Sequence, residues 1–212
     1  MKKTVLPFII ILSFTAFLYA AAIPKPAIIQ KPGDWTADVR YTNPQQITLK
    51  TEDGKQVRFW YLIMTVTNKT GREVDFYPRC DIVTDTFQLI TAGNGTPEEV
   101  LNAIKKRHSN TYPFLELFEK TSSKLLVGVD NAKDLAIVWP DFDQQAKEVK
   151  IFISGLSNEI VLIDHPSQKL ADGSPAKVIL RKTLELDYTL GGDPAFRSDT
   201  TLEFKSKDWI MR

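Results

Sequence analysis

The sequence has very few of the residues that form disulfide bonds or bind zinc, namely cysteine and histidine. Among 212 residues it has one cysteine, Cys80, and two histidines, His108 and His165. One cysteine cannot form an intramolecular disulfide, so burial alone has to hold the fold together. No spacing joins the histidines and the thiol into a zinc site, and we predict no metal site. Cys80 fits a buried small hydrophobic residue better than a reactive thiol, which is the alternative.

The sequence also lacks an excess of charge of either sign. It has 27 Lys and Arg against 26 Asp and Glu, and without Lys2 and Lys3 the balance becomes 25 against 26, a net charge of −1. A nearly neutral surface is a poor match for nucleic acid or for anionic lipid, both of which select basic proteins. We therefore expect no nucleic-acid partner.

No arrangement of residues that would support catalysis or cofactor binding stands out. Gly155-Leu156-Ser157-Asn158-Glu159 approaches a nucleophile elbow, but it lacks the final glycine and an apolar β pattern follows it instead of a helix. Gly93-Asn94-Gly95-Thr96 lacks the Lys-Ser/Thr of a phosphate-binding loop. We predict no catalytic residues and no cofactor. The alternative is a hydrolase whose Asp, Glu and His residues are far apart in the sequence.

The N-terminal segment carries the clearest signal in the chain. A cationic Met1-Lys2-Lys3 precedes an uncharged apolar run over residues 4–23, with small residues at Ala20 and Ala22. This pattern is typical of a secretory signal peptide. We predict a signal peptide over 1–22, a Pro-rich tether over 23–34, and a periplasmic or extracellular location. The alternative is an uncleaved membrane anchor over residues 4–23, because this run is long enough to cross a bilayer.

The rest of the chain, residues 35–212, is predicted to be one mainly β domain. Apolar residues alternate with polar ones in many short segments, with turn residues such as Asp172-Gly173 between them. The segment 57–67 is apolar at successive positions, so we expect it to be covered on both faces and to lie at the centre of the core. Its residues Phe59, Tyr61, Leu62, Ile63, Met64 and Val66 are predicted to be buried.

One segment has a helical period and interrupts the β pattern as an insertion near residues 96–119. Thr96 and Glu99 have the spacing of a capping box around Pro97, and Val100, Leu101 and Ile104 form an apolar stripe. Lys105, Lys106 and Arg107 then place positive charge at the C-terminal end. These three residues are a possible partner contact, and the alternative is a solvated helix end on a helix that plugs the sandwich.

Part of the sequence resembles a known kind of extracellular domain. The segment Val66-Thr67-Asn68-Lys69-Thr70-Gly71-Arg72-Glu73-Val74-Asp75-Phe76 resembles the hairpin of bacterial immunoglobulin-like domains. The chain is also similar to a family of uncharacterised secreted bacterial proteins with a telokin-like domain, on the segments 125–132, 139–143 and 209–212. The resemblance implies export and an immunoglobulin-like antiparallel β-sandwich with one short helical insertion, and it implies no activity.

These observations favour a non-enzymatic module of the cell envelope. Export, the β pattern and the lack of a catalytic motif together indicate that the surface or loops of the sandwich bind a protein or glycan partner.

Overall fold

The computed structural model describes residues 32–50, 53–93, 95–192 and 200–212. The predicted signal peptide and almost all of the predicted tether lie outside these residues. Within them the chain is mainly β, with one α-helix, α1 (Glu98–His108), and two short 3-10 helices, η1 (Phe118–Lys120) and η2 (Val129–Asn131). None of the helices in the described ranges is both long and apolar enough to span a membrane.

The first sheet is built around the long strand β3. β3 pairs with β9 along one edge, while β1 and β2 follow each other along its other edge, and β7 adds to β9 in parallel. Its strands are β1 (Asp38–Tyr41), β2 (Gln45–Lys50), β3 (Gln56–Thr67), β7 (Glu116–Leu117) and β9 (Lys133–Pro140).

The second sheet is built around β12, which pairs with β10 and β11 on one edge and β13 on the other. β5 joins β10, and β6 joins β5. Its strands are β5 (Arg79–Thr84), β6 (Leu89–Thr91), β10 (Glu148–Ser154), β11 (Ile160–Lys169), β12 (Pro175–Leu190) and β13 (Leu202–Met211). A separate pair, β4 (Val74–Asp75) with β8 (Lys124–Leu125), lies beside the sheets.

The two sheets pack face to face over the main hydrophobic core. Trp60, Leu62 and Met64 of β3 lie in this core together with Ile151 of β10 and Leu186 of β12. The mainly β, layered architecture predicted from the sequence is therefore confirmed.

A second core covers the opposite face of β3. Phe59, Tyr61 and Ile63 of β3 pack with Val100 and Ile104 of α1. β3 is thus buried on both faces, as its uninterrupted apolar pattern predicts, and Ile63 is only 1% exposed. The helix covers the outer face of the first sheet and does not fill the space between the two sheets.

The predicted cap of α1 is wrong. Pro97, in an extended conformation, is the N-cap residue, and no side chain caps the helix. The hydroxyl of Thr96 is buried and has no hydrogen-bond partner among the described residues. Pro97 takes the N-cap position in place of Thr96, because the fixed φ angle of proline is compatible with the N-cap position as well as with the first position of the helix.

The later part of the insertion, from Tyr112 to Phe118, forms no α-helix. Leu115 is buried without regular structure, and Leu117 then pairs with Ala136 as part of β7.

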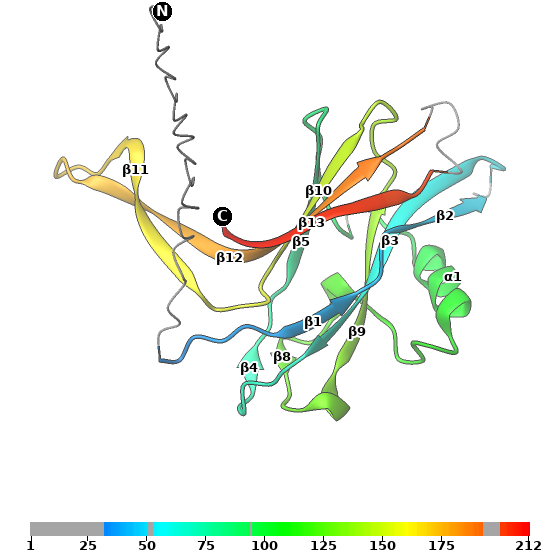
Figure 1. Ribbon diagram of the computed structural model, residues 1–212, viewed down its shortest axis with the longest axis horizontal. Coiled ribbons are helices and arrows are strands. Elements are labelled where there is room, and N and C mark those ends of the chain that lie inside the picture. The colour runs from blue at the N-terminus through cyan, green and yellow to red at the C-terminus, as the bar shows by residue number, and fades with distance from the viewer. Residues whose placement is uncertain (1–31, 51–52, 94, 193–199) are drawn as a thin grey trace, which may run out of the picture.

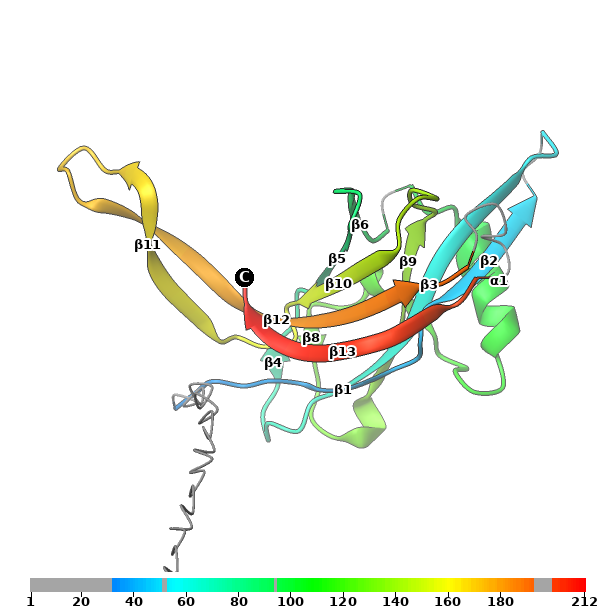
Figure 2. The same ribbon diagram turned by 45° about the horizontal axis from the view of Figure 1, so that its top comes forward.

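One part of the second sheet leaves the body of the molecule. β11 and the first half of β12, with the turn between them, form a two-stranded ribbon over residues 160–181, which we call the arm. Figures 1 and 2 show it extending away from both sheets, at the opposite end of the molecule from α1. In the described part of the chain, β11 pairs only with β12.

Candidate functional site

A wide hollow lies where the arm joins the body. It has a volume of about 870 Å³. A smaller hollow of about 220 Å³ shares Ser154 and Arg181 with it. We call the two together the arginine groove, and its principal residues are Trp35, Tyr77, Arg79, Ser154, Arg181 and Arg212.

A glycine at the end of β10 shapes the floor of this groove. Gly155 has a φ of +79°, and a Cβ atom built on it would lie 2.3 Å from the backbone oxygen of Tyr77. Only glycine permits both the conformation and the close approach. The chain therefore turns out of β10 directly against the segment that leads into β5.

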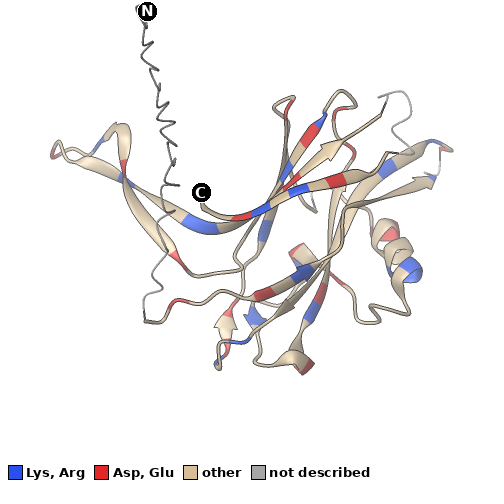
Figure 3. Ribbon diagram, viewed as in Figure 1, with Lys and Arg blue, Asp and Glu red and all other residues tan. Residues whose placement is uncertain are grey.

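Three strands bring arginines to the groove. Arg79 begins β5, Arg181 belongs to β12, and Arg212 follows β13. The backbone N–H of Arg181 donates to the oxygen of Arg212 at 2.7 Å, and the reciprocal bond is 3.1 Å. The two side chains therefore lie on the same face of the sheet. Figure 3 shows basic residues where β12 leaves the body for the arm.

The guanidinium groups differ in their partners. Arg79 forms an ion pair with Asp81 at 3.3 Å. The guanidinium carbon of Arg212 lies 4.0 Å from the centre of the Phe152 ring, which orients it over the sheet surface. Neither Arg181 nor Arg212 forms an ion pair with any carboxylate of the described residues. Both are exposed.

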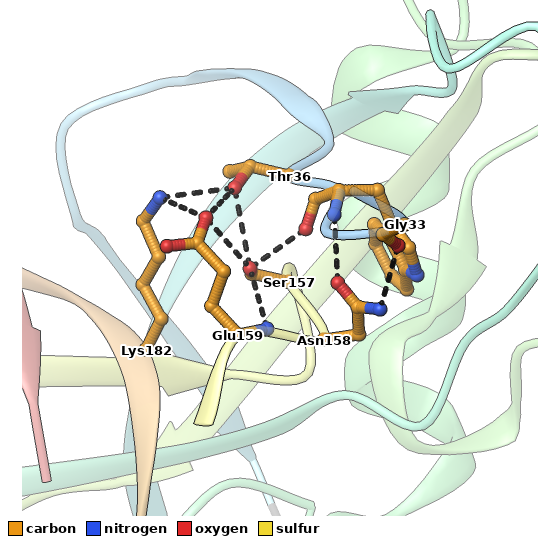
Figure 4. A network of polar contacts seen from close by, with 7 residues as sticks. Gly33, Thr36, Ser157, Asn158, Glu159 and Lys182 are labelled. Atoms are coloured by element: carbon orange, nitrogen blue, oxygen red, sulfur yellow. Dashed lines mark hydrogen bonds and ion pairs between the residues drawn. The ribbon is translucent and has the colours of Figure 1, made fainter. Parts of the chain in front are cut away.

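A buried polar network, drawn in Figure 4, shares Trp35 and Ser157 with the lining of the groove. The ammonium of Lys182 lies 2.5 Å from a carboxylate oxygen of Glu159, and it donates to the hydroxyl of Thr36 at 3.1 Å. The side chains of Lys182 and Glu159 are 10% and 5% exposed. The Ser157 hydroxyl donates to the backbone oxygen of Trp35 at 2.7 Å. The network ties the segment before β1 to the base of the arm.

These contacts give the network a structural role. The Ser157 hydroxyl donates its hydrogen bond to a backbone oxygen and accepts one from the backbone N–H of Glu159. The Lys182 ammonium contacts Glu159 and Thr36 and has no lone pair with which to accept a proton from Ser157. The segment from Gly155 to Glu159 bends between β10 and β11, with no helix after it, and is not a nucleophile elbow.

The basic residues predicted as a possible contact lie far from this groove. Lys105, Lys106 and Arg107 are exposed at the end of α1. Arg107 also donates to the backbone oxygen of Gln46 at 2.9 Å and to the Tyr61 hydroxyl at 3.1 Å. Arg107 therefore helps to dock the helix on the first sheet, which the sequence did not predict.

The remaining candidates do not converge. The Nε2 atom of His108 lies 2.9 Å from the Tyr61 hydroxyl, and His165 accepts from the backbone of Ser167 and Gln168 through Nδ1. Burial first, and then the carboxylates of Asp81 and Glu119, raise the pKa of the Cys80 thiol well above its usual range, which fits the predicted buried residue. Within the described ranges, no three His, Cys, Asp or Glu side chains gather in a way that could hold a metal ion.

Similarity to known proteins adds nothing further to this site. No family model, no curated protein and no solved structure matches the chain.

Proposed function

We propose that this protein is an exported, non-enzymatic binding module that holds a partner protein with its arm and the adjoining groove. The single observation that carries the proposal is the set of aliphatic side chains that the arm exposes to solvent.

The arm exposes such side chains on both of its faces. Residues opposite each other in an antiparallel pair share a face. Leu162 lies opposite Ile179, so these two share a face with Ile160, while Val161 and Ile163 occupy the other. Leu162 is 60% exposed and Ile179 is 51% exposed. A strand with aliphatic residues on both faces normally lies inside a protein.

Nothing else in the described molecule covers these residues. A two-stranded ribbon is only marginally stable by itself in water. A contiguous exposed apolar surface is typical of an interaction site. Covering one face of the arm would contribute on the order of a few kcal/mol to binding, since each aliphatic side chain that becomes fully buried contributes about 1.5–3 kcal/mol.

The chemistry of the arm favours a protein over a glycan. Sugars bind to exposed aromatic rings and polar groups, whereas Ile160, Leu162 and Ile179 offer only aliphatic surface. Among the described strands, only β12 pairs with β11, so the other edge of β11 offers backbone groups to which an extended segment of a partner can pair. Near the tip, Pro166 and a register shift between Asp164 and Lys169 interrupt the strand, so the regular part of this edge is Ile160–Asp164.

Site-specific photocrosslinking in the native cells tests this function. A photoreactive residue replaces Leu162 in the full chain, and the matched control carries it at Asn102, an exposed position on α1. We expect a discrete covalent product with another protein from position 162 and none from position 102. The additional substitution Ile179→Glu, next to the probe on the same face, should remove the product.

Three results would overturn the proposal. They are no product at position 162, equal products at both positions, and a product that contains only copies of this chain.

Export and the immunoglobulin-like topology are part of the same proposal. The N-terminal pattern supports export, and we expect N-terminal sequencing of the protein from the native envelope to begin at Ile23. An intact Met1 in the membrane fraction would favour the anchor over residues 4–23. The two face-to-face sheets support an immunoglobulin-like relationship.

A further inference from the structure

The acidic residues in and around the arginine groove already have basic partners. Glu73 and Asp75 both pair with Lys124, at 3.5 Å and 2.7 Å. Asp81 pairs with Arg79 and also accepts a hydrogen bond from Thr91 at 2.7 Å. Within the described part of the chain, the positive charges of Arg181 and Arg212 are therefore not offset by these carboxylates.

The position of these two arginines is itself unfavourable for the protein alone. They lie directly opposite each other on neighbouring strands, where like charges repel. An anionic group placed between them would remove this repulsion and accept from both guanidinium groups. Guanidinium groups bind carboxylates with two parallel hydrogen bonds, which are among the stronger hydrogen bonds in proteins.

The two arginines are continuous with one face of the arm. Arg181 lies opposite Ile160, and Ile179 lies two residues before Arg181 on the same face. A molecule bound along this face therefore contacts aliphatic side chains on the arm and guanidinium groups at the base of the arm. A polypeptide that carries both apolar and acidic residues has this combination of properties.

The larger hollow offers one exposed aromatic ring, and not the set of stacking rings that is typical of a glycan site. Trp35 is only 9% exposed, so its ring is not free to stack on a sugar. Tyr77, which is 71% exposed, is the remaining aromatic ring among the residues that line the larger hollow.

We propose that the groove binds an acidic segment of the partner protein, with its carboxylates at Arg181 and Arg212 and its apolar side chains on Ile160, Leu162 and Ile179. This inference rests on the proposed function, because it names the part of the partner that the groove recognises. It assigns affinity to the arm and specificity for acidic sequences to the arginines.

Binding of a labelled synthetic peptide of alternating Leu and Asp, followed by fluorescence anisotropy, tests the inference on the purified protein. We expect the double variant Arg181→Gln/Arg212→Gln to weaken binding by about tenfold or more, because two charge-assisted contacts are lost. The matched control, Lys105→Gln/Lys106→Gln, changes the net charge equally at the far end of the molecule and should bind as the parent does.

The salt dependence of the peptide affinity distinguishes the contribution of the arginines from that of the aliphatic side chains. We expect the affinity of the parent protein to fall with rising salt, since exposed charges are screened. The Arg181→Gln/Arg212→Gln variant should lose most of this dependence. The variant Leu162→Ser/Ile179→Ser should bind more weakly but keep the salt dependence of the parent.

Three outcomes would overturn the inference. They are equal weakening in the lysine control, unchanged binding in the arginine variant, and tighter binding of an oligogalacturonate probe than of the peptide. The crosslinking at position 162 is independent of this peptide, so a crosslinked partner together with arginine-insensitive peptide binding leaves the function standing and removes only the inference. Arginine-dependent peptide binding without a crosslinked partner removes the proposed function, and it leaves only the preference of the groove for acidic, apolar peptides.

Discussion

At the scale of single residues, the ion pair of Glu159 and Lys182 is the most buried one in the described structure. It joins the turn after β10 to β12, and through Thr36 it also holds the segment before β1. A buried ion pair contributes little to the free energy of folding, because the loss of hydration offsets the attraction between the charges. A buried charge without its partner is strongly destabilising. The contribution of this pair therefore becomes visible only when it is broken on one side.

We expect Glu159→Ala to lower the free energy of unfolding by about 3–5 kcal/mol, because the Lys182 ammonium stays buried without its partner. The measurement is denaturant unfolding. The double variant Glu159→Leu/Lys182→Met removes both charges and should recover most of the loss. A loss below about 1 kcal/mol in the single variant would show that Lys182 reaches solvent when its partner is absent.

His108 should make the protein less stable in mild acid. Burial first, and then the neighbouring Arg107, lower the pKa of His108 below its ordinary value of 6.5. The unfolded chain therefore binds more protons than the folded one between the lowered pKa and values just above 6.5. The free energy of unfolding contributed by this residue is thus fully present at neutral pH and decreases as the pH falls through 6.5.

The variant His108→Gln isolates this effect, since Gln can still contact the Tyr61 hydroxyl but does not titrate. We expect the parent to lose stability more steeply than the variant between pH 7 and pH 5, measured by denaturant unfolding at each pH. Comparing the two removes the contribution of Glu119, whose pKa is raised by burial and which acts in the opposite direction. Parallel curves would contradict the assignment to His108.

At the scale of elements, the burial predicted from the sequence agrees with the structure where the apolar pattern lies within a single strand or helix. β3 is apolar at successive positions, and it is covered by the second sheet on one face and by α1 on the other. The stripe of Val100, Leu101 and Ile104 is buried as predicted. The cap of α1 was wrong because Thr96 and Pro97 each satisfy a known preference, and spacing alone does not decide which of them precedes the first turn.

The end of β10 gives a prediction at this scale. We expect Gly155→Ala to lower the free energy of unfolding by about 2–4 kcal/mol, because a left-handed conformation and a backbone clash with Tyr77 are both penalised. Gly71→Ala is the matched control, since Gly71 has a similar φ of +78° and nothing lies within 4 Å of its added Cβ. It should cost about 1–2 kcal/mol. Equal losses in denaturant unfolding would show that the close approach at Gly155 contributes nothing.

At the scale of the whole molecule, the sequence did not reveal the candidate site. Arg79, Arg181 and Arg212 come together only because β5, β12 and β13 belong to the same sheet, and no local pattern contains that pairing. The sequence does not reveal the arm for a related reason. Its apolar residues predict only a strand, because an aliphatic run has the same composition whether it lies in a core or in a protruding ribbon.

The arm should be separable from the fold of the body. Its strands pair with each other over residues 160–181 and most of their side chains are exposed, so they contribute little to either core. Replacing residues 162–179 with Asn-Gly joins the cross-strand pair Val161 and Leu180 through a tight turn. We expect the free energy of unfolding to change by less than about 1 kcal/mol, as is usual for surface changes away from a core.

Denaturant unfolding of this shortened chain, compared with the parent, is the measurement, and hydrogen exchange of the intact protein is its companion. Amides of the arm should exchange well before those of β3 and β9, because local opening of an exposed ribbon requires little free energy. A loss of more than about 2 kcal/mol on shortening, or equal protection of the arm and β3, would show that the arm belongs to the cooperative fold. In that case its aliphatic residues would support the body, and the surface proposed for the partner would have to be sought elsewhere.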